Sequence, residues 1–411
     1  MLAASLFRRM IHEGTLIILD AAGRQQQFGS GTPQVTIRLT DRRTELALLR
    51  NPKLALGEAY MDGRLLIESG TLYDLLHIAA RNIVHFENLT GYRGWENIRR
   101  WLRPLQTYNP VSRARRNVAH HYDLSGDLYD LFLDTDRQYS CAYFQTPSDS
   151  LEEAQENKKR HLGAKLRLDE PNLEILDIGS GWGGLGLYLA RETGANVTGV
   201  TISEEQTKVS QARAKKAGLD ESVQFRLEDY RNLRGQYDRI ISVGMFEHVG
   251  TQHYPEFFRT LRNLLTADGV AVLHSIGRMQ PPGATNPWLR KYIFPGGYTP
   301  ALSEVLAAIE RCGLWVTDIE ILRLHYAETL RKWRERFQHN RERARKLYDE
   351  RFCRMWEFYL TGCEISFREM GQMVFQIQLT RKQDSVPLTR DFITDWERAH
   401  MPFAETQQAA E

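Results

Sequence analysis

Long apolar runs are missing from the 411-residue sequence, and none approaches the roughly 20 residues that a membrane-spanning helix needs. Arg8 and Arg9 interrupt the first apolar residues, so a secretory signal is not expected. Cysteine is scarce, with four residues in the chain: Cys141, Cys312, Cys353 and Cys363. They are widely separated and show no metal-ligand spacing, which predicts reduced thiols and no metal site. These absences predict a cytoplasmic protein.

A large excess of charge of one sign is missing as well, because the formal net charge is +2. The sequence therefore carries no global signal of nucleic-acid binding, and any anionic partner has to be met by local patches. With 42% hydrophobic and 26% charged residues, the composition is that of a soluble globular protein. A chain of this length exceeds one typical domain and suggests two.

The most informative stretch runs from residue 173 to residue 190. Residues 173–178 form a nearly continuous apolar run, as expected for a strand buried on both faces of a parallel sheet. Five glycines follow within eight residues, and a helical pattern begins among them. A strand, a glycine turn and a helix N-terminus together form a nucleotide-cofactor site. A tight turn without a ligand is the alternative.

The charge before this turn separates two kinds of cofactor. Gly179, Gly181 and Gly184 fit the G-x-G-x-x-G dinucleotide fingerprint, which is weak evidence on its own. A dinucleotide would place its pyrophosphate against the carboxylate of Asp177, which would repel it, and bulky Trp182 hinders a close approach. S-adenosylmethionine instead carries an ammonium group and a sulfonium, which a carboxylate attracts. The D-x-G-x-G-x-G pattern that starts at Asp177 resembles the first motif of the Rossmann-like methyltransferases.

The first 85 residues are predicted to form a small α+β domain. Two strands, at 15–20 and 34–39, flank a Gly- and Gln-rich turn region, and helical periodicity follows at 45–49 and 71–84. No residue of this domain is assigned a chemical role.

Residues 86–112 are interpreted as a basic amphipathic linker. Four apolar side chains share one face of a predicted helix and are surrounded by arginines: Trp95, Ile98, Trp101 and Leu102. Such a stretch can lie on anionic lipid. It can equally pack two domains together while its basic face remains in solvent. The two interpretations are compatible.

The remaining chain, 113–411, is predicted to be the catalytic domain. Further strands are expected at residues 196–200, 223–227, 239–243, 269–273, 315–322 and 373–379. The last two are expected to form a closing hairpin. Ser150 and Glu153 form a capping box that predicts a helix to about residue 168. A helix ending near Phe132 precedes it, and the charged segment 331–351 is interpreted as a solvated helix.

Several motifs in order carry a family resemblance. H-Y-D-L-S, Y-S-C-A-Y-F, L-D-I-G-S-G-W-G-G, G-M-F-E-H-V-G and F-P-G-G-Y occur in this sequence within roughly residues 113–385. Together they resemble the cyclopropane-fatty-acyl-phospholipid synthases and their mycolic-acid-modifying relatives. The resemblance implies an α/β fold: a Rossmann-like class I methyltransferase domain with a seven-stranded, mostly parallel sheet. The small N-terminal domain resembles the lipid-binding domain of the phospholipid-acting members.

The resemblance also implies the cofactor site, with S-adenosylmethionine as cofactor. The residues assigned to it are Tyr122, Tyr139, Ser140, Asp177, Gly179, Gly181, Thr201, Ile202, Gln206, Asp229 and Tyr230. Rossmann-type sites commonly carry an acid after the second strand, where this chain has Thr201 and Ile202, a departure that the synthases share. Asp229 and Tyr230 are assigned to the adenine ring.

A second group of residues is assigned to catalysis. The resemblance implies a bound bicarbonate ion as the base, held by residues that match Cys141, Glu247, His274, Ile276 and Tyr326. Glu247 and His274 follow adjacent parallel strands, whose ends converge on one crevice, although a Glu–His pair can also be structural. Cys363 is the rival nucleophile. A thiolate that attacks an alkene is chemically implausible, and a cysteine beside Phe358 and Phe367 is typical of packing.

The predicted reaction is methylene transfer from S-adenosylmethionine to the cis double bond of an acyl chain in a phospholipid. A methyl-branched product and N-methylation of a small amine remain enzymatic alternatives, and a lipid-binding relative with an inactive site is the non-enzymatic one. The resemblance further implies a homodimer that contacts the inner membrane surface transiently and is otherwise cytoplasmic.

Overall fold

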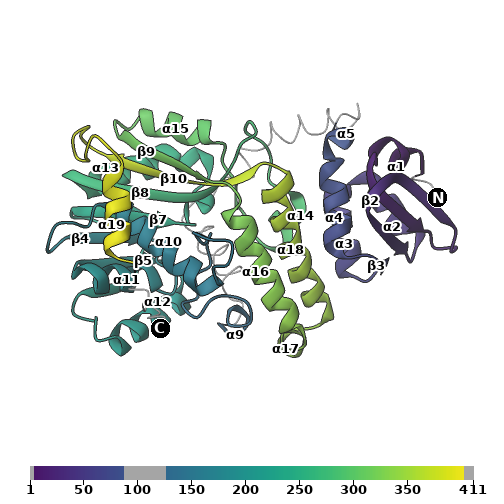
Figure 1. The fold of residues 1–411 in the computed structure, drawn as a ribbon, viewed down its shortest axis with the longest axis horizontal. Helices are drawn as coiled ribbons and strands as arrows, with labels where there is room; N and C mark the ends of the chain where they lie inside the picture. The colour runs from purple at the N-terminus through teal and green to yellow at the C-terminus, as the bar shows by residue number, and fades with distance from the viewer. Residues whose placement is uncertain (1–3, 88–125, 402–411) are drawn as a thin grey trace, which may run out of the picture.

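The computed structural model describes residues 4–87 and 126–401, which form a small N-terminal part and a larger α/β part (Figure 1). The predicted linker lies almost entirely outside the described residues, as does Tyr122. The boundaries predicted at residues 85 and 112 stay predictions.

The N-terminal part is built on a three-stranded antiparallel sheet. Strand β1 (Glu13–Leu19) lies between the two halves of β2 (Gln25–Leu39), and β3 (Leu65–Ser69) extends the sheet beside the second half. The Gln-rich residues were expected in a turn, which is wrong, because Gln25 and Gln27 pair with β1. Glutamine is compatible with a strand whose alternate side chains face solvent. Helices cover the sheet: α1 (Ala4–Met10), α2 (Arg42–Arg50), α3 (Pro52–Met61), α4 (Leu72–Arg81) and α5 (Ile83–Glu87).

The larger part contains a seven-stranded sheet with the order β6-β5-β4-β7-β8-β10-β9. Its strands are β4 (Glu174–Ile178), β5 (Asn196–Thr201), β6 (Val223–Leu227), β7 (Tyr237–Val243), β8 (Leu265–Arg278), β9 (Trp315–Leu322) and β10 (Gln372–Thr380). The five neighbouring strands β6, β5, β4, β7 and β8 run parallel to one another. Strand β10 is antiparallel to both of its neighbours, β8 and β9. The predicted mostly parallel, seven-stranded methyltransferase sheet is confirmed.

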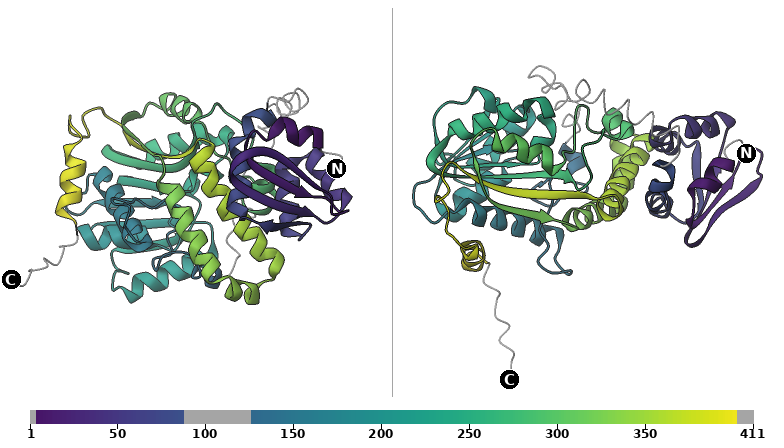
Figure 2. Two further views of the ribbon diagram at one scale, coloured as in Figure 1. Left: turned by 45° about the vertical axis from the view of Figure 1, so that its right-hand side comes forward. Right: turned by 90° about the horizontal axis from the view of Figure 1, so that it is seen from above.

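Helices cover both faces of this sheet (Figure 2). One face packs against α10 (Leu151–Leu166), α11 (Gly184–Thr193), α12 (Glu204–Lys216) and α19 (Asp391–Ala399). The other face packs against α13 (Tyr254–Leu264) and α15 (Leu302–Glu310). Helix α10 begins with the predicted capping box, in which Ser150 and Glu153 bond each other's backbone N–H groups. Only α9 (Gly126–Tyr129) is helical in the described part of the segment before Phe132.

Strands β9 and β10 pair as predicted, but no tight hairpin joins them. Three helices lie between them in the chain: α16 (His325–His339), α17 (Arg341–Leu347) and α18 (Glu350–Glu369). The charged segment 331–351 is therefore not one solvated helix. Trp333 and Phe337 on α16 are fully buried, because the charges occupy the opposite face of an amphipathic helix.

The N-terminal part packs on the larger part through α3 and α4, which lie against α18, and α3 also meets α14 (Pro287–Tyr292) (Figure 1). The Tyr60 hydroxyl donates to Glu357 at 2.8 Å, and Glu58 accepts from Lys291 at 2.6 Å and from Tyr292 at 2.8 Å. The indole of Trp288 is buried against the backbone of Gly57. The two parts therefore share an interface with both polar and apolar contacts.

Candidate active site

The glycine turn after β4 takes its shape from bonds to the neighbouring strand. The N–H groups of Gly179 and Ser180 donate to the carbonyl of Val200 at 2.9 and 3.0 Å. Gly179 has a φ of +84°, and a Cβ added there would lie 2.8 Å from the Met245 Cβ. Gly181 has a φ of +55°, and a Cβ there would meet no atom within 4 Å. The turn needs glycine for its backbone conformation and leaves open space in front of Gly181.

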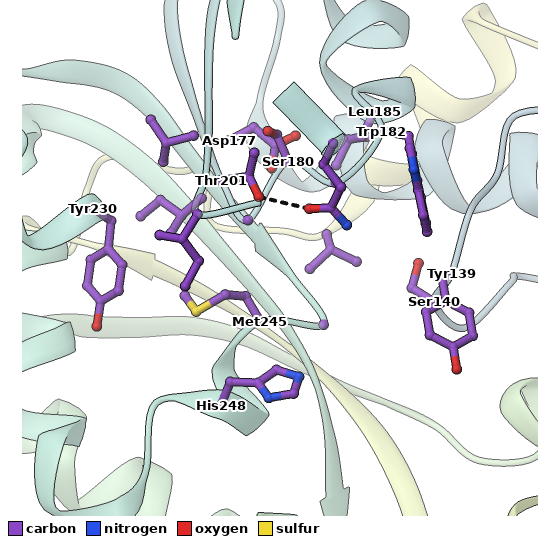
Figure 3. A pocket seen from close by; sticks show the side chains of 18 of the residues that line it. Tyr139, Ser140, Asp177, Ser180, Trp182, Leu185, Thr201, Tyr230, Met245 and His248 are labelled. Carbon is purple, nitrogen blue, oxygen red and sulfur yellow. Dashed lines mark hydrogen bonds between the residues drawn. The ribbon is translucent and has the colours of Figure 1, made fainter. Parts of the chain in front are cut away.

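A pocket with a cavity volume of about 160 Å³ opens at this turn, at the carboxyl ends of β4, β5 and β7 (Figure 3). This is where open α/β sheets bind their ligands. Its lining includes ten of the eleven residues assigned to the cofactor: Tyr139, Ser140, Asp177, Gly179, Gly181, Thr201, Ile202, Gln206, Asp229 and Tyr230. In Figure 3, Tyr139 and Tyr230 stand at opposite sides of the pocket, with Met245 between them and His248 below. The structure thus brings these residues together around one cavity.

Asp177 is the buried anion of this pocket. It is 2% exposed, and its Oδ2 makes no hydrogen bond to any residue in the described ranges. Burial raises the pKa of this carboxyl to about 7, although the positive charge of Lys158 opposes the shift. An unpaired buried carboxylate is costly unless a cation neutralises it. The pocket therefore fits a ligand with a positive charge, as the ammonium and sulfonium groups of S-adenosylmethionine would supply.

Lys158 on α10 is a residue of this site that the sequence interpretation missed. Its side chain is 1% exposed, and its Nζ donates to Gln138 Oε1 at 2.5 Å and to Ser140 Oγ at 2.9 Å. One turn earlier, Gln155 donates to the Ser140 carbonyl at 3.0 Å. The pair spaced i, i+3 on α10 was the available signal, because such residues share one helical face. Together they fix the segment that carries Tyr139 into the pocket.

At the end of β5, the Thr201 hydroxyl donates to Gln206 Oε1 at 2.8 Å (Figure 3). This bond orients the Gln206 amide so that its NH₂ group is available for an acceptor on a ligand. Gln206, oriented by Thr201, therefore supplies a donor where many Rossmann-type sites place an acid.

Asp229 lies on the pocket wall but already has a strong partner. Arg231 donates to it from Nε at 2.9 Å and from Nη2 at 2.7 Å. Tyr230 follows in a short 3₁₀ turn and is buried against Phe257. An adenine amino group would share the Asp229 carboxylate with this arginine, so the adenine assignment stays a prediction.

None of the residues assigned to catalysis lines this pocket. Glu247 follows β7, and His274 and Ile276 lie in the last part of β8. Glu247 Oε1 accepts from the N–H of Ile276 at 2.7 Å, and Glu247 Oε2 makes no hydrogen bond within the described residues. Burial raises the pKa of Glu247 to about 7, against the effect of the Ile276 N–H. The N–H of Ile276, one of the residues assigned to the bicarbonate, therefore already donates to Glu247. His274 is fully buried two residues before Ile276, and burial keeps its pKa well below the ordinary value.

Cys141 lies in the segment before α10, whereas Tyr326 lies on α16. The N–H of Ala142, next to Cys141, donates at 3.0 Å to Thr329 Oγ, one helical turn from Tyr326. Cys141 is fully buried, and burial raises the pKa of its thiol. The Tyr326 ring packs between those of Trp333 and Phe367. No group of histidines, cysteines and carboxylates in the described ranges could hold a metal ion.

A second, largely apolar cavity of about 290 Å³ lies between the two parts of the chain. The wall that the larger part of the chain supplies includes Tyr359, Gly362 and Cys363 of α18. The N-terminal part supplies residues from α1, α2, α3, α4 and the sheet, among them Phe7, Ile37, Leu48, Leu56, Leu75 and Ile78. Burial raises the pKa of the Cys363 thiol to about 12, so it is neutral at physiological pH. Cys363 is thus a wall residue of this cavity rather than a neighbour of Asp177.

Comparisons with known proteins are consistent with this geometry. The family model described as mycolic acid cyclopropane synthetase matches residues 110–377, and one described as a domain of unknown function (DUF7884) matches residues 6–89. A probable fatty acid methyltransferase of Pseudomonas putida is 35% identical, with 84% of this chain and 86% of that protein covered. The cyclopropane-fatty-acyl-phospholipid synthase of Escherichia coli K12 is 36% identical, covering 86% and 89%. The crystal structure of mycolic acid cyclopropane synthase CmaA1 complexed with SAH and CTAB aligns with a TM-score of 0.61 at 34% identity, covering 66% of this chain and 99% of that one.

Proposed function

Since the chain belongs to the mycolic acid cyclopropane synthetase family, we propose that it transfers a methylene group from S-adenosylmethionine to the cis double bond of an acyl chain in a phospholipid. Membership of this family establishes that the chain is a methyltransferase that uses S-adenosylmethionine. The observation that carries the proposal further is the apolar cavity next to the cofactor pocket. An acyl chain needs an apolar channel of this kind, whereas a small amine does not.

The position of that cavity supports a lipid substrate. Its walls come from both parts of the chain, and one hydrogen bond separates it from the cofactor pocket: Tyr139 Oη and Tyr359 Oη are 2.7 Å apart. The Escherichia coli relative, whose match covers 86% of this chain and so extends beyond the catalytic domain, is named cyclopropane-fatty-acyl-phospholipid synthase. This is the reason for proposing a phospholipid rather than a free acid.

The residues present favour an alkene reaction that excludes water. The cofactor supplies a methyl group on a positively charged sulfur, which Asp177 would hold in place. An alkene that gains a methyl group becomes a carbocation, and loss of a proton from the new methyl group lets the C–H electron pair close the ring. The buried aromatic walls around Tyr139 protect such a cation from water.

The proton acceptor is proposed to be bicarbonate near Glu247, His274, Ile276, Cys141 and Tyr326. The unpaired Glu247 Oε2 fits the O–H of that ion, and a neutral His274 fits one of its oxygens as donor. Because the Ile276 N–H already donates to Glu247, it would have to be shared. The neutral thiol of Cys363 is a poor base and nucleophile.

A methyl-branched product is the second candidate, since the Pseudomonas putida relative is named as a probable fatty acid methyltransferase. The products diverge at the same cation. Loss of a proton from the new methyl group closes the ring, whereas loss of a proton from elsewhere gives a methylene chain, and a methyl-branched saturated chain needs a hydride from a further reductant. Nothing in the pocket favours N-methylation of a small amine.

Contact with a membrane is proposed through the N-terminal part. No helix within the described ranges combines the length and apolarity needed to cross a bilayer. Leu46 and Val84 are exposed, however, and they are close in sequence to Leu48 and Ile83, which line the apolar cavity. Exposed apolar side chains beside an apolar cavity suit an interfacial position. Sedimentation with anionic vesicles tests the contact, and light scattering tests the expected homodimer.

The experiment that tests the function uses methyl-labelled S-adenosylmethionine, the purified full chain and vesicles of phospholipid with monounsaturated chains. Label is expected in the lipid, and proton NMR distinguishes a ring from a methyl branch or a methylene group. Parallel samples with free monounsaturated fatty acid, and with vesicles whose chains are saturated, define the substrate. Label in the free acid alone would contradict the phospholipid assignment, and label in neither lipid would contradict the function.

A further inference from the structure

Three residues form a row across the strands next to the candidate active site. Gln376 on β10 is the cross-strand partner of His274 on β8 and of Glu320 on β9. The side chains of the residues beside Gln376, Phe375 and Ile377, lie in the core on the opposite face of the sheet. The row therefore lies on the face that α10 covers, and both His274 and Gln376 are buried there.

Helix α10 places a cation over this row. Lys165 Nζ donates to Gln376 Oε1 at 2.8 Å, and Gln376 Nε2 lies 3.1 Å from His274 Nδ1. All three side chains are 2% exposed or less. The contacts form one continuous path from a lysine on α10 to the imidazole at the end of β8.

We infer that Lys165 and Gln376 are positioning residues that hold the imidazole of His274 in one tautomer, with its proton on Nε2. An ammonium group has only donors, so the Gln376 amide must turn its oxygen toward Lys165. Its NH₂ group then faces His274, and an NH₂ group also has only donors. Nδ1 of His274 must accept, which leaves the proton on the far side of the ring.

A chain of charges fixes Lys165 in turn. Its Nζ lies 2.5 Å from Glu320 Oε2, and Glu320 lies 2.6 Å from His161 Nε2. His161 Nδ1 is 2.7 Å from Glu397 on α19. Because both His161 nitrogens face carboxylates, these contacts favour its charged form, and they raise its pKa against the effect of burial. Glu320 and Glu397 thus hold the cationic side chains of Lys165 and His161 on α10. Glu397 on α19 is the last group in this series of contacts.

The tautomer matters for the reaction proposed above, and its use in catalysis rests on that proposal. An imidazole with its proton on Nε2 is a neutral donor on the side of the ring away from Gln376, which suits an anion such as the proposed bicarbonate. The opposite tautomer would present a lone pair and repel that anion. The role of Lys165 and Gln376 is to select the donor without touching the substrate.

The direct test needs neither substrate nor turnover. Full-length protein with ¹⁵N-labelled histidine gives separate long-range ¹⁵N signals for Nδ1 and Nε2, and a His274→Asn variant identifies the signal among the twelve histidines. A protonated Nε2 and a bare Nδ1 are expected for His274. A proton on Nδ1, or on both nitrogens, would overturn the inference even if the protein methylates lipid.

Variants then test the cause. In Gln376→Glu both oxygens accept, so His274 is expected to carry a proton on Nδ1 and turnover to fall on the order of 10- to 100-fold, as when a residue that orients a functional imidazole is lost. Lys165→Met leaves the amide free to turn, and mixed signals are expected. Gln224→Glu makes the same chemical change on β6, where the side chain is exposed, and should change neither signal nor rate. An unchanged His274 signal in folded Gln376→Glu and Lys165→Met would refute the inference.

Discussion

The hydroxyl of Tyr139 lies 2.7 Å from that of Tyr359, and this bond joins the walls of two cavities of different chemistry. Tyr139 lines the polar cofactor pocket, and Tyr359 lines the apolar cavity between the two parts of the chain. Burial raises the pKa of Tyr359 well above its ordinary value, so this phenol stays neutral. In the proposed reaction, this tyrosine pair stands between an acyl chain in the apolar cavity and a methyl donor in the cofactor pocket.

Asp177 predicts a pH dependence of cofactor binding. Its pKa in the folded protein is raised from 3.8 to about 7, so the folded state holds this proton more tightly and the free energy of unfolding falls as pH rises between these values. A cationic ligand favours the ionised form. The affinity for S-adenosylmethionine should therefore rise by up to about tenfold per pH unit as pH approaches about 7, then level off. Calorimetric titration from about pH 5.5 to about pH 8 measures this.

Two variants distinguish the effect of Asp177 on cofactor binding from that of Glu247, the other carboxyl whose pKa is raised to about 7. Asp177→Asn should bind the cofactor weakly at all these pH values and should be more stable than wild type above about pH 7, because it has no buried charge. Glu247→Gln should retain the wild-type pH dependence of binding. A flat wild-type profile, or a profile abolished by Glu247→Gln instead, would show that Asp177 does not control affinity.

Glu247 predicts a separation of binding from turnover. Glu247→Gln can still accept the Ile276 N–H, so the loop should keep its shape and cofactor affinity should remain near normal. Turnover should fall by on the order of 100-fold or more, because an amide would replace the carboxylate that is proposed to accept the O–H of bicarbonate. Glu256→Gln is the matched control, since Glu256 is partly exposed to solvent and forms its ion pair with His253. Normal turnover in Glu247→Gln would remove Glu247 from the mechanism.

Cys363 predicts opposite effects of a small and a large side chain. Cys363→Ala removes the thiol and should keep turnover within a few fold of wild type, because a thiol with a pKa near 12 is not a nucleophile at neutral pH. Cys363→Phe fills the apolar cavity and should raise the apparent KM for lipid or lower turnover, while calorimetry shows unchanged cofactor binding. Loss of turnover in Cys363→Ala would restore a chemical role for the thiol, and normal kinetics in Cys363→Phe would place the acyl chain elsewhere.

The sheet and the cofactor pocket could be predicted from sequence because their signals are local. The apolar strands and the glycine turn locate β4, and the capping box at Ser150 locates the start of α10. All the described residues that were assigned to the cofactor line one pocket. Most of them lie at the carboxyl ends of neighbouring strands, whereas Tyr139 and Ser140 come from the segment before α10.

The missed features depend on contacts between distant segments. Lys158 looks like any lysine on a helix until its Nζ meets Ser140, and Gln376 looks like a strand residue until Lys165 and His274 lie on either side of it. The apolar cavity needs two parts of the chain, so no single stretch predicts it. Burial of a polar side chain with a long-range partner has no periodicity that a sequence reader can detect.

The interface between the two parts predicts unequal effects of the same substitution at two helical glycines. At Gly57 on α3, an added Cβ would lie 2.8 Å from Cε2 of the buried Trp288, which has little freedom to move. At Gly362 on α18, an added Cβ would meet only Leu76 Cδ1, at 3.9 Å. Alanine favours a helix by up to about 1 kcal/mol over glycine, whereas overpacking costs about 1–3 kcal/mol. Gly362→Ala should therefore raise the Tm slightly, and Gly57→Ala should lower it and reduce activity on vesicles more than cofactor binding. Equal Tm values for the two variants would mean that Trp288 does not pack tightly on α3, and the wall of the apolar cavity would then be looser than the structure shows.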